Sequence, residues 1–96
     1  GGNKMKYWIA DIEERNGEFE YKQPIIFTAE TKAKANEIHE FHVSTWYGSS
    51  MRWDEDDKCY WYEHVTITEG RMTEIDEHTY EQMRKHGNPD MTKTER

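Results

Sequence analysis

The chain has 96 residues and a formal net charge of −7, so it has room for one acidic domain with a single core. No stretch approaches the roughly 18 consecutive apolar residues that a membrane helix requires, which excludes a transmembrane class. Leucine is absent, but four Trp, six Tyr and three Phe indicate a folded domain rather than a disordered chain, because disordered segments are poor in aromatic residues.

The two ends of the chain are expected to lie outside the domain. Residues 1–4 precede a methionine, Met5, and are interpreted as a remnant of the expression vector. The polar residues 88–96 follow a helix stop signal and predict a flexible tail. A single domain is therefore expected over residues 5–87.

Two segments rich in aromatic and β-branched residues, 6–12 and 18–27, predict a β-hairpin. Between them lies Asn16-Gly17, the dipeptide that most strongly favours a two-residue type I′ turn. A turn at this point would pair Arg15 with Glu18, Ile12 with Tyr21, Ala10 with Gln23 and Trp8 with Ile25.

One face of this hairpin is expected to be apolar and the other mixed. The apolar face carries Trp8, Ala10, Ile12, Phe19, Tyr21, Ile25 and Phe27, and the opposite face carries Tyr7, Ile9, Asp11, Glu13, Glu20 and Lys22. Pro24 cannot donate a hydrogen bond to a ladder, so the second strand is expected at a sheet edge or at a bulge.

A helix is predicted from about Ala29 to Trp46, with Thr28 as its N-cap. Its apolar stripe consists of Ala35, Ile38, His42 and Trp46. A polar loop is expected over residues 49–58. The alternating residues 59–68 then predict a third strand, whose core face carries Cys59, Trp61, Glu63, Val65 and Ile67.

The last part of the domain predicts a short strand and a helix. Glu69-Gly70 is expected to turn the chain into a fourth strand over residues 71–75, and Asp76 is expected to cap a final helix that stops before Gly87. The expected fold is therefore α+β, a single antiparallel sheet of three or four strands packed on one main helix, in the order ββαβ(β)α with a C-terminal helix.

Histidines suggest one candidate metal site. His39 and His42 are spaced i, i+3 on the predicted main helix, and a zinc site would need further ligands from Cys59 or His64. These last two residues have opposite parity on the predicted strand, so at most one of them can face the helix. The alternative interpretation is that His42 packs at the edge of the core and His39 is solvated.

Acidic and aromatic residues suggest a protein-binding surface instead. The candidate residues are Tyr7, Trp53, Asp54, Glu55, Asp56, Asp57, Tyr60 and Tyr62, because tyrosine and tryptophan dominate interface hot spots. The negative field around them would repel phosphates, which disfavours direct nucleic-acid binding. The alternative is that a second layer, such as the C-terminal helix, covers these aromatic residues.

No catalytic or cofactor motif is present in the sequence. Cys59 is expected on the core face of a strand, where a buried thiol is inert, and the glycines are scattered singly rather than gathered in a phosphate-binding loop. The sequence therefore predicts a protein that is not an enzyme and uses no cofactor.

Several features together resemble small orphan proteins of phages and mobile elements. These are the opening strand from Met5 to Ile9, the Asn-Gly hairpin, the Thr28-Ala29-Glu30-Thr31 helix start and the closing helix that begins at Ile75-Asp76. Some acidic members of that class block host defence by docking on a nucleic-acid-binding surface. The resemblance implies a similar mode of action.

The expected function is thus that of a non-enzymatic acidic module that binds a basic protein surface in the cytoplasm. For a protein of a phage or mobile element, this surface would belong to a protein of the host cell. Its net charge of −7 would steer association with such a surface. A small metal-binding domain that uses the His-x-x-His pair is the alternative. A homodimer through the open sheet face or an edge strand is compatible with either function.

Overall fold

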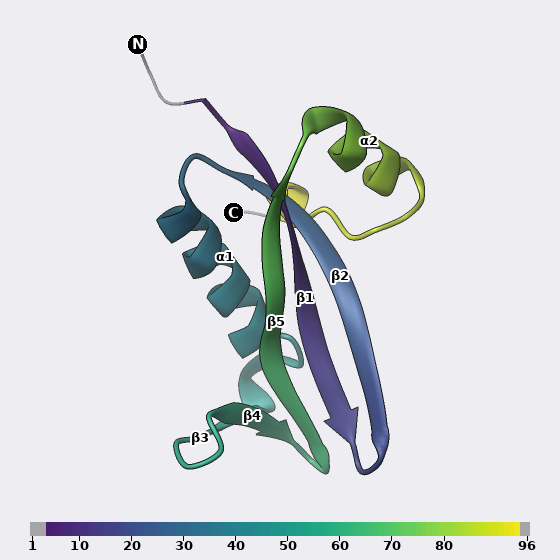
Figure 1. Cartoon of the computed structure of the whole chain (residues 1–96). Helices are drawn as coiled ribbons and strands as arrows, with labels where there is room; N and C mark the ends of the chain where they lie inside the picture. Colours follow the sequence, from purple (N-terminus) through teal and green to yellow (C-terminus); the bar gives the residue numbers. More distant parts are fainter. Residues whose placement is uncertain (1–3, 95–96) are drawn as a thin grey trace.

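The computed structural model describes residues 4–94, which form one antiparallel five-stranded sheet and two α-helices (Figure 1). The strand order in the sheet is β2-β1-β5-β4-β3. The elements are β1 (Lys6–Asn16), β2 (Phe19–Ala29), α1 (Lys32–Ser44), β3 (Arg52–Asp54), β4 (Cys59–Tyr62), β5 (Val65–Ile75) and α2 (Glu77–Lys85), with short 3₁₀ turns at Gly48–Ser50 and Met91–Thr94. Of the predicted vector remnant and tail, residues 1–3 and 95–96 lie outside the described residues.

The predicted count of three or four strands is wrong, and the reason lies in one tight turn. The segment 59–68 is not a single strand, because the chain reverses at Glu63-His64, where Glu63 adopts a φ of 55°. The turn produces β4 and β5, which pair with each other. The expected polar loop contributes β3, and the expected fourth strand is the second half of β5.

The hairpin of β1 and β2 forms with a register shifted by two residues. The turn is centred on Gly17-Glu18, and Trp8 pairs with Phe27 rather than with Ile25. Gly17 supplies the positive φ of 64° that the first central position of a type II′ turn requires. A shift of two residues leaves every side chain on the same face, so the predicted apolar face remains the core face.

The core lies between this face and α1. Its buried apolar residues are Trp8, Ala10, Ile12, Ile25, Phe27, Ala29, Ala35, Val43 and Ile67. Phe19 and Tyr21 share the face but stay exposed, because they lie toward the tip of the hairpin beyond the helix. The expectation that Pro24 marks an edge strand is confirmed, since β2 ends the sheet.

Helix α1 begins later than the sequence predicts. Thr28 and Ala29 remain in β2, and the N-cap is Thr31, whose Oγ1 accepts a hydrogen bond from the Lys34 amide at 3.1 Å. Asp76 caps α2 as predicted, with Oδ1 2.7 Å from the Thr79 amide.

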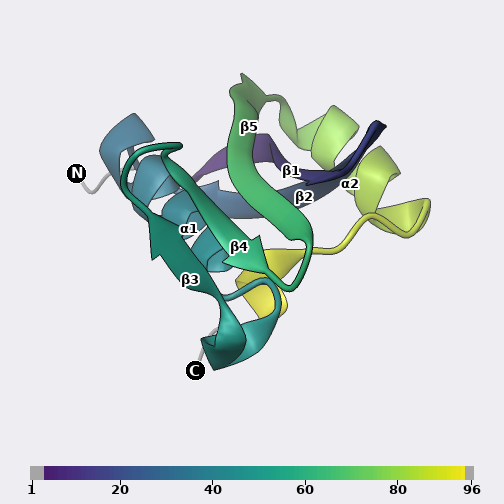
Figure 2. The same ribbon diagram turned by 90° about the horizontal axis from the view of Figure 1, so that it is seen from below.

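The two α-helices lie on opposite faces of the sheet (Figures 1 and 2). Tyr80 of α2 packs on Tyr7 of β1, with ring centroids 4.8 Å apart, and Tyr7 points away from the α1 side because its neighbour Trp8 points toward it. Helix α2 covers only the end of this second face where β1 begins. Within residues 4–94, the other half, between the β1–β2 turn and β3, carries no helix.

Candidate functional site

The uncovered half of the second sheet face is here called the open face. It is formed by the side chains of every second residue along each strand. Along one row, strand pairing brings together Glu20, Arg15, Thr66, Trp61 and Arg52 from five different strands. Neighbouring rows add Glu13, Lys22 and Thr68. The face is therefore polar and charged, with Trp61 as its aromatic residue.

A hollow of about 440 Å³ lies on this face. It is lined by Glu13, Glu14, Arg15, Glu20, Asp57, Cys59, Thr66 and Thr68. The Glu14 carboxylate accepts a hydrogen bond from Tyr47 on the α1 side, so three carboxylates, those of Glu13, Glu20 and Asp57, face one guanidinium. Arg15 pairs with Glu20, and the hydrogen bond from Arg15 holds the pKa of Glu20 below its ordinary value. Lys22 approaches Glu13 at 4.0 Å from the side. Carboxylates remain in excess, and the hollow favours cationic groups.

The acidic run between β3 and β4 forms an ordered turn. Asp54 accepts hydrogen bonds from the amides of Asp56 at 2.9 Å and Asp57 at 3.1 Å, and from the indole Nε1 of Trp61 at 3.1 Å. These bonds, the one from Asp57 above all, hold the pKa of the Asp54 carboxyl below its ordinary value. Asp54 thus shapes the turn, and Asp57 lines the hollow.

Glu55 is also engaged within the turn. Its carboxylate accepts hydrogen bonds from the Lys58 ammonium and from the Trp53 indole, and these bonds lower its pKa. Lys58 takes the left-handed conformation, with a φ of 55°, that closes the four-residue loop. The charges of the run are therefore partly used to fix the loop in place.

Three predicted aromatic residues, Tyr7, Tyr60 and Tyr62, lie away from the acids of the hollow. Tyr60 and Tyr62 lie half-buried on the α1 side, where Tyr62 stacks on Tyr47 with ring centroids 4.5 Å apart, and Trp53 packs on Tyr60 at 4.9 Å. Tyr7 lies under α2. The alternative that other elements cover these residues therefore holds for Tyr7 and, in part, for Tyr60 and Tyr62.

The alternation of residues 59–68 predicted the wrong face for Trp61. The uninterrupted strand expected over residues 59–68 assigned Trp61 to the core face, and the turn at Glu63-His64 reverses that assignment for β4. Tyr60 and Tyr62 now share the face of Ile67, while Cys59 and Trp61 share the open face. Neither Glu nor His is a typical turn residue, so the sequence carried little signal of the reversal.

The four candidate metal ligands do not come together. His39 and His42 are buried in α1 on one side of the sheet, Cys59 lines the open face on the other side, and His64 is exposed in the β4–β5 turn. Among residues 4–94, no group of three or more His, Cys, Asp or Glu side chains is placed to hold a metal ion.

The interpretation of the two helix histidines was half right. His42 packs at the core edge as expected, but His39 is 2% exposed rather than solvated. Its Nε2 donates a hydrogen bond to the backbone carbonyl oxygen of Asp11 at 2.8 Å. Because a carbonyl oxygen only accepts, Nε2 carries the hydrogen. His39 is therefore part of the core.

Cys59 lines the hollow but is only 5% exposed. Burial, with the nearby carboxylates of Asp54 and Asp57, raises the pKa of its thiol above the ordinary value. The nucleophilic form of cysteine is the thiolate, so these neighbours oppose its activation. The open face therefore presents carboxylates rather than an activated thiol.

Comparison with known proteins gives no relative from which a role could be transferred. A scan against protein-family models found no match, and searches of curated proteins and of solved structures found none either. Within the described residues, no helix is both long and apolar enough to cross a membrane. The geometry of the open face is thus the basis for assigning a function.

Proposed function

We propose that this protein is a non-catalytic binding module whose open face receives a basic surface of another protein. The observation that carries this proposal is the meeting of Asp57 with Glu13 and Glu20 around one hollow, although the turn that holds Asp57 is far from the hairpin in sequence. Gathering like charges costs free energy in the unbound protein. A cationic partner removes this cost on binding.

The shape of the hollow suits side chains that end in a cation. A volume of about 440 Å³ accommodates a lysine or arginine side chain with room for water. The hydroxyl groups of Thr66 and Thr68 offer further acceptors, and Trp61 offers a ring face for a guanidinium at the border.

The field of the whole chain acts in the same direction. A net charge of −7 on a domain this small accelerates encounter with a positive surface at low ionic strength. Proteins that bind nucleic acid present such surfaces. A partner of that type is also what the resemblance to phage and mobile-element proteins implies.

The test is calorimetric titration of the protein with a lysine-rich peptide at low salt. Glu13→Gln removes a carboxylate of the hollow, and we expect it to weaken binding about two- to fivefold. The matched control is Glu37→Gln on α1, which removes the same charge and also breaks a contact with a lysine, Lys34 at 3.6 Å. Equal weakening by both variants would show that only net charge matters and would contradict the proposal.

A further inference from the structure

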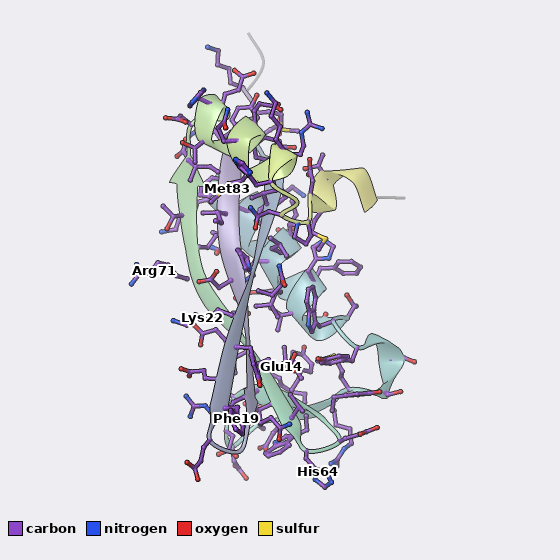
Figure 3. All side chains as sticks on the ribbon, turned by 90° about the vertical axis from the view of Figure 1, so that its right-hand side faces the viewer. Glu14, Phe19, Lys22, His64, Arg71 and Met83 are labelled. Atoms are coloured by element: carbon purple, nitrogen blue, oxygen red, sulfur yellow. The ribbon has the colours of Figure 1, made fainter. Side chains whose placement is uncertain are left out.

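The edge of the sheet at β2 has two parts that differ in hydrogen bonding. The Ile26 amide donates to the carbonyl oxygen of Pro89 at 2.9 Å, and the Thr28 amide donates to Thr92 Oγ1 at 2.9 Å. The C-terminal segment therefore covers the end of β2 that leads to α1. Figure 3 looks onto this edge; among the residues that the structure describes, no strand pairs with the other end of β2, toward the hairpin tip.

The period of a strand identifies the uncovered donors. Groups that point away from β1 belong to every second residue, and the pairing of β1 with β2 runs without a register shift. Counting back from Thr28 and Ile26, the outward groups belong to Pro24, Lys22 and Glu20. Pro24 has no amide hydrogen, so the free amides of this edge within β2 are those of Lys22 and Glu20.

Charged residues on an edge strand ordinarily discourage pairing with another chain. Here their order makes the edge self-complementary. In an antiparallel pair of two β2 strands centred on Tyr21, Glu20 of each copy lies opposite Lys22 of the other. Both are outward-facing residues, so each such pair exchanges two main-chain hydrogen bonds.

The neighbouring strands extend this pattern. Glu20 pairs with Arg15 of β1, and Lys22 lies beside Glu13. Across the two copies, each row would run from Arg15 through Glu20 to Lys22 and Glu13 of the second copy, with charges that alternate at every step. Opposite charges on directly facing strand residues stabilise a sheet.

Other registers lack this match. If the pairing is centred on Glu20 or on Lys22 instead, Glu20 lies opposite Glu20 or Lys22 lies opposite Lys22, and these facing like charges destabilise the dimer. If even-numbered residues of one copy lie opposite odd-numbered residues of the other, the outward-pointing main-chain groups of one β2 strand face residues whose main-chain groups are already bonded to β1. On the α1 side, the favoured register sets the two copies of Tyr21 opposite each other, with Phe19 of each copy diagonal to Tyr21 of the other; these side chains are 57% and 66% exposed in the single chain.

We propose that two copies of this chain pair through the Phe19-to-Gln23 edge of β2 in the register centred on Tyr21. The ladder is short and ends at Pro24, so the contact area falls below that of stable dimers. The dimer is therefore weak, with a dissociation constant of about 0.1 to 1 mM.

The experiment is sedimentation velocity over roughly 10 µM to 2 mM, in about 0.15 M salt to screen the net charge. We expect the wild-type protein to dimerise and Glu20→Lys and Lys22→Glu each to reduce association at least tenfold. An equimolar mixture of these two variants restores both opposite-charge pairs and forms a heterodimer. The doubly reversed variant also dimerises.

The controls separate this edge from general charge effects. Glu37→Lys and Lys34→Glu on α1 change the net charge by the same amounts as the two edge variants. We expect each α1 variant alone to dimerise like the wild-type protein, and an equimolar mixture of the two to dimerise no more strongly. Hydrogen exchange adds a local readout: the Glu20 and Lys22 amides gain protection with concentration, while those of Ile26 and Thr28 do not.

Three results would overturn the proposal. The first is a monomer at every concentration, and the second is a mixture of the two edge variants that stays monomeric. The third is a dimer in which the Glu20 and Lys22 amides gain no protection, which would place the contact elsewhere. Because all four substitutions lie at exposed positions, circular dichroism is expected to show that each variant stays folded.

Discussion

His39 donates a hydrogen bond from Nε2 to the carbonyl oxygen of Asp11, 2.8 Å away, and so joins α1 to the bulge between β1 and β5. The register shifts there, so that Gly70 and Arg71 lie opposite Asp11 alone. A bulge leaves the ladder locally incomplete, and the imidazole of α1 supplies the missing donor. The ring Nδ1 faces the Glu69 carboxylate at 3.9 Å.

The first prediction concerns this bond. His39→Leu leaves the Asp11 carbonyl without its donor inside the core, and we expect the free energy of unfolding to fall by about 1–3 kcal/mol in urea denaturation. His39→Gln keeps a side-chain donor and is expected to recover part of the loss. Equal stability of the two variants would contradict a role for the hydrogen bond.

The second prediction concerns the close approach of Gly70 to β1. A Cβ atom at Gly70 would lie 2.7 Å from the Cβ of Asp11 and 2.9 Å from the Cγ of Glu13. Gly70→Ala therefore forces the two strands apart, and we expect it to destabilise the protein by about 1–3 kcal/mol in thermal denaturation. Thr73→Ala, an exposed site on the same strand, is the control and should change stability by less than about 0.5 kcal/mol.

The third prediction concerns two tyrosines that resist ionisation. The hydrogen bond from Tyr47 to the Glu14 carboxylate raises the pKa of Tyr47 to about 12, and burial raises the pKa of Tyr80 to about 12. Since these pKa values are higher in the folded state, the stability they contribute is complete below pH 10 and is lost as the pH rises toward 12.

Phenolate absorbance at 295 nm measures this directly. Unfolded protein should titrate near pH 10, and the folded protein should retain a later step that Tyr47→Phe reduces. A single step near pH 10 in the folded protein would show that neither tyrosine is held in its neutral form.

The fourth prediction concerns Asp54 in the β3–β4 turn. Its pKa is lowered by hydrogen bonds from the Asp57 amide, the Trp61 indole and the Asp56 amide. The stabilising effect is therefore present above the ordinary pKa of aspartate and is lost as the pH falls through the lowered value. The Trp61 indole N–H resonance should shift in that acidic range.

Asp54→Ala supplies the check on this assignment. It removes the acceptor, so the indole resonance should take its acid-like position already at neutral pH. Asp56→Ala, which keeps the Asp54 carboxylate, should leave the resonance near its wild-type position. A pH-independent indole resonance in the wild-type protein would contradict the role given to Asp54.

The hairpin shows what the alternation of apolar and polar residues predicts correctly and what it does not. Alternation placed Trp8 and Ile12 on the core face and Glu13 on the other, and the structure agrees. The pairing itself was missed by two residues, because turns at Asn16-Gly17 and at Gly17-Glu18 give the same faces. Hydrophobic pattern fixes a face more firmly than it fixes a register.

The open face was harder to predict, because it depends on contacts distant in sequence. Asp57 lines the same hollow as Glu13 only because β4 pairs with β5 and β5 pairs with β1. The turn at Glu63-His64 that creates this order has none of the usual glycine, proline or asparagine. The local sequence therefore identified the acidic residues but did not predict that they line one hollow.

The most direct test of the proposed function is a map of where a cation binds. Titration of ¹⁵N-labelled protein with a lysine-rich peptide at low salt should shift the backbone amides of Glu13, Glu20, Asp57, Thr66 and Thr68, together with the Trp61 indole. Amides along the outer side of α1, near Glu37 and Glu40, should stay in place. Shifts spread evenly over both faces, or centred on α1, would contradict the assignment of the open face as the binding site.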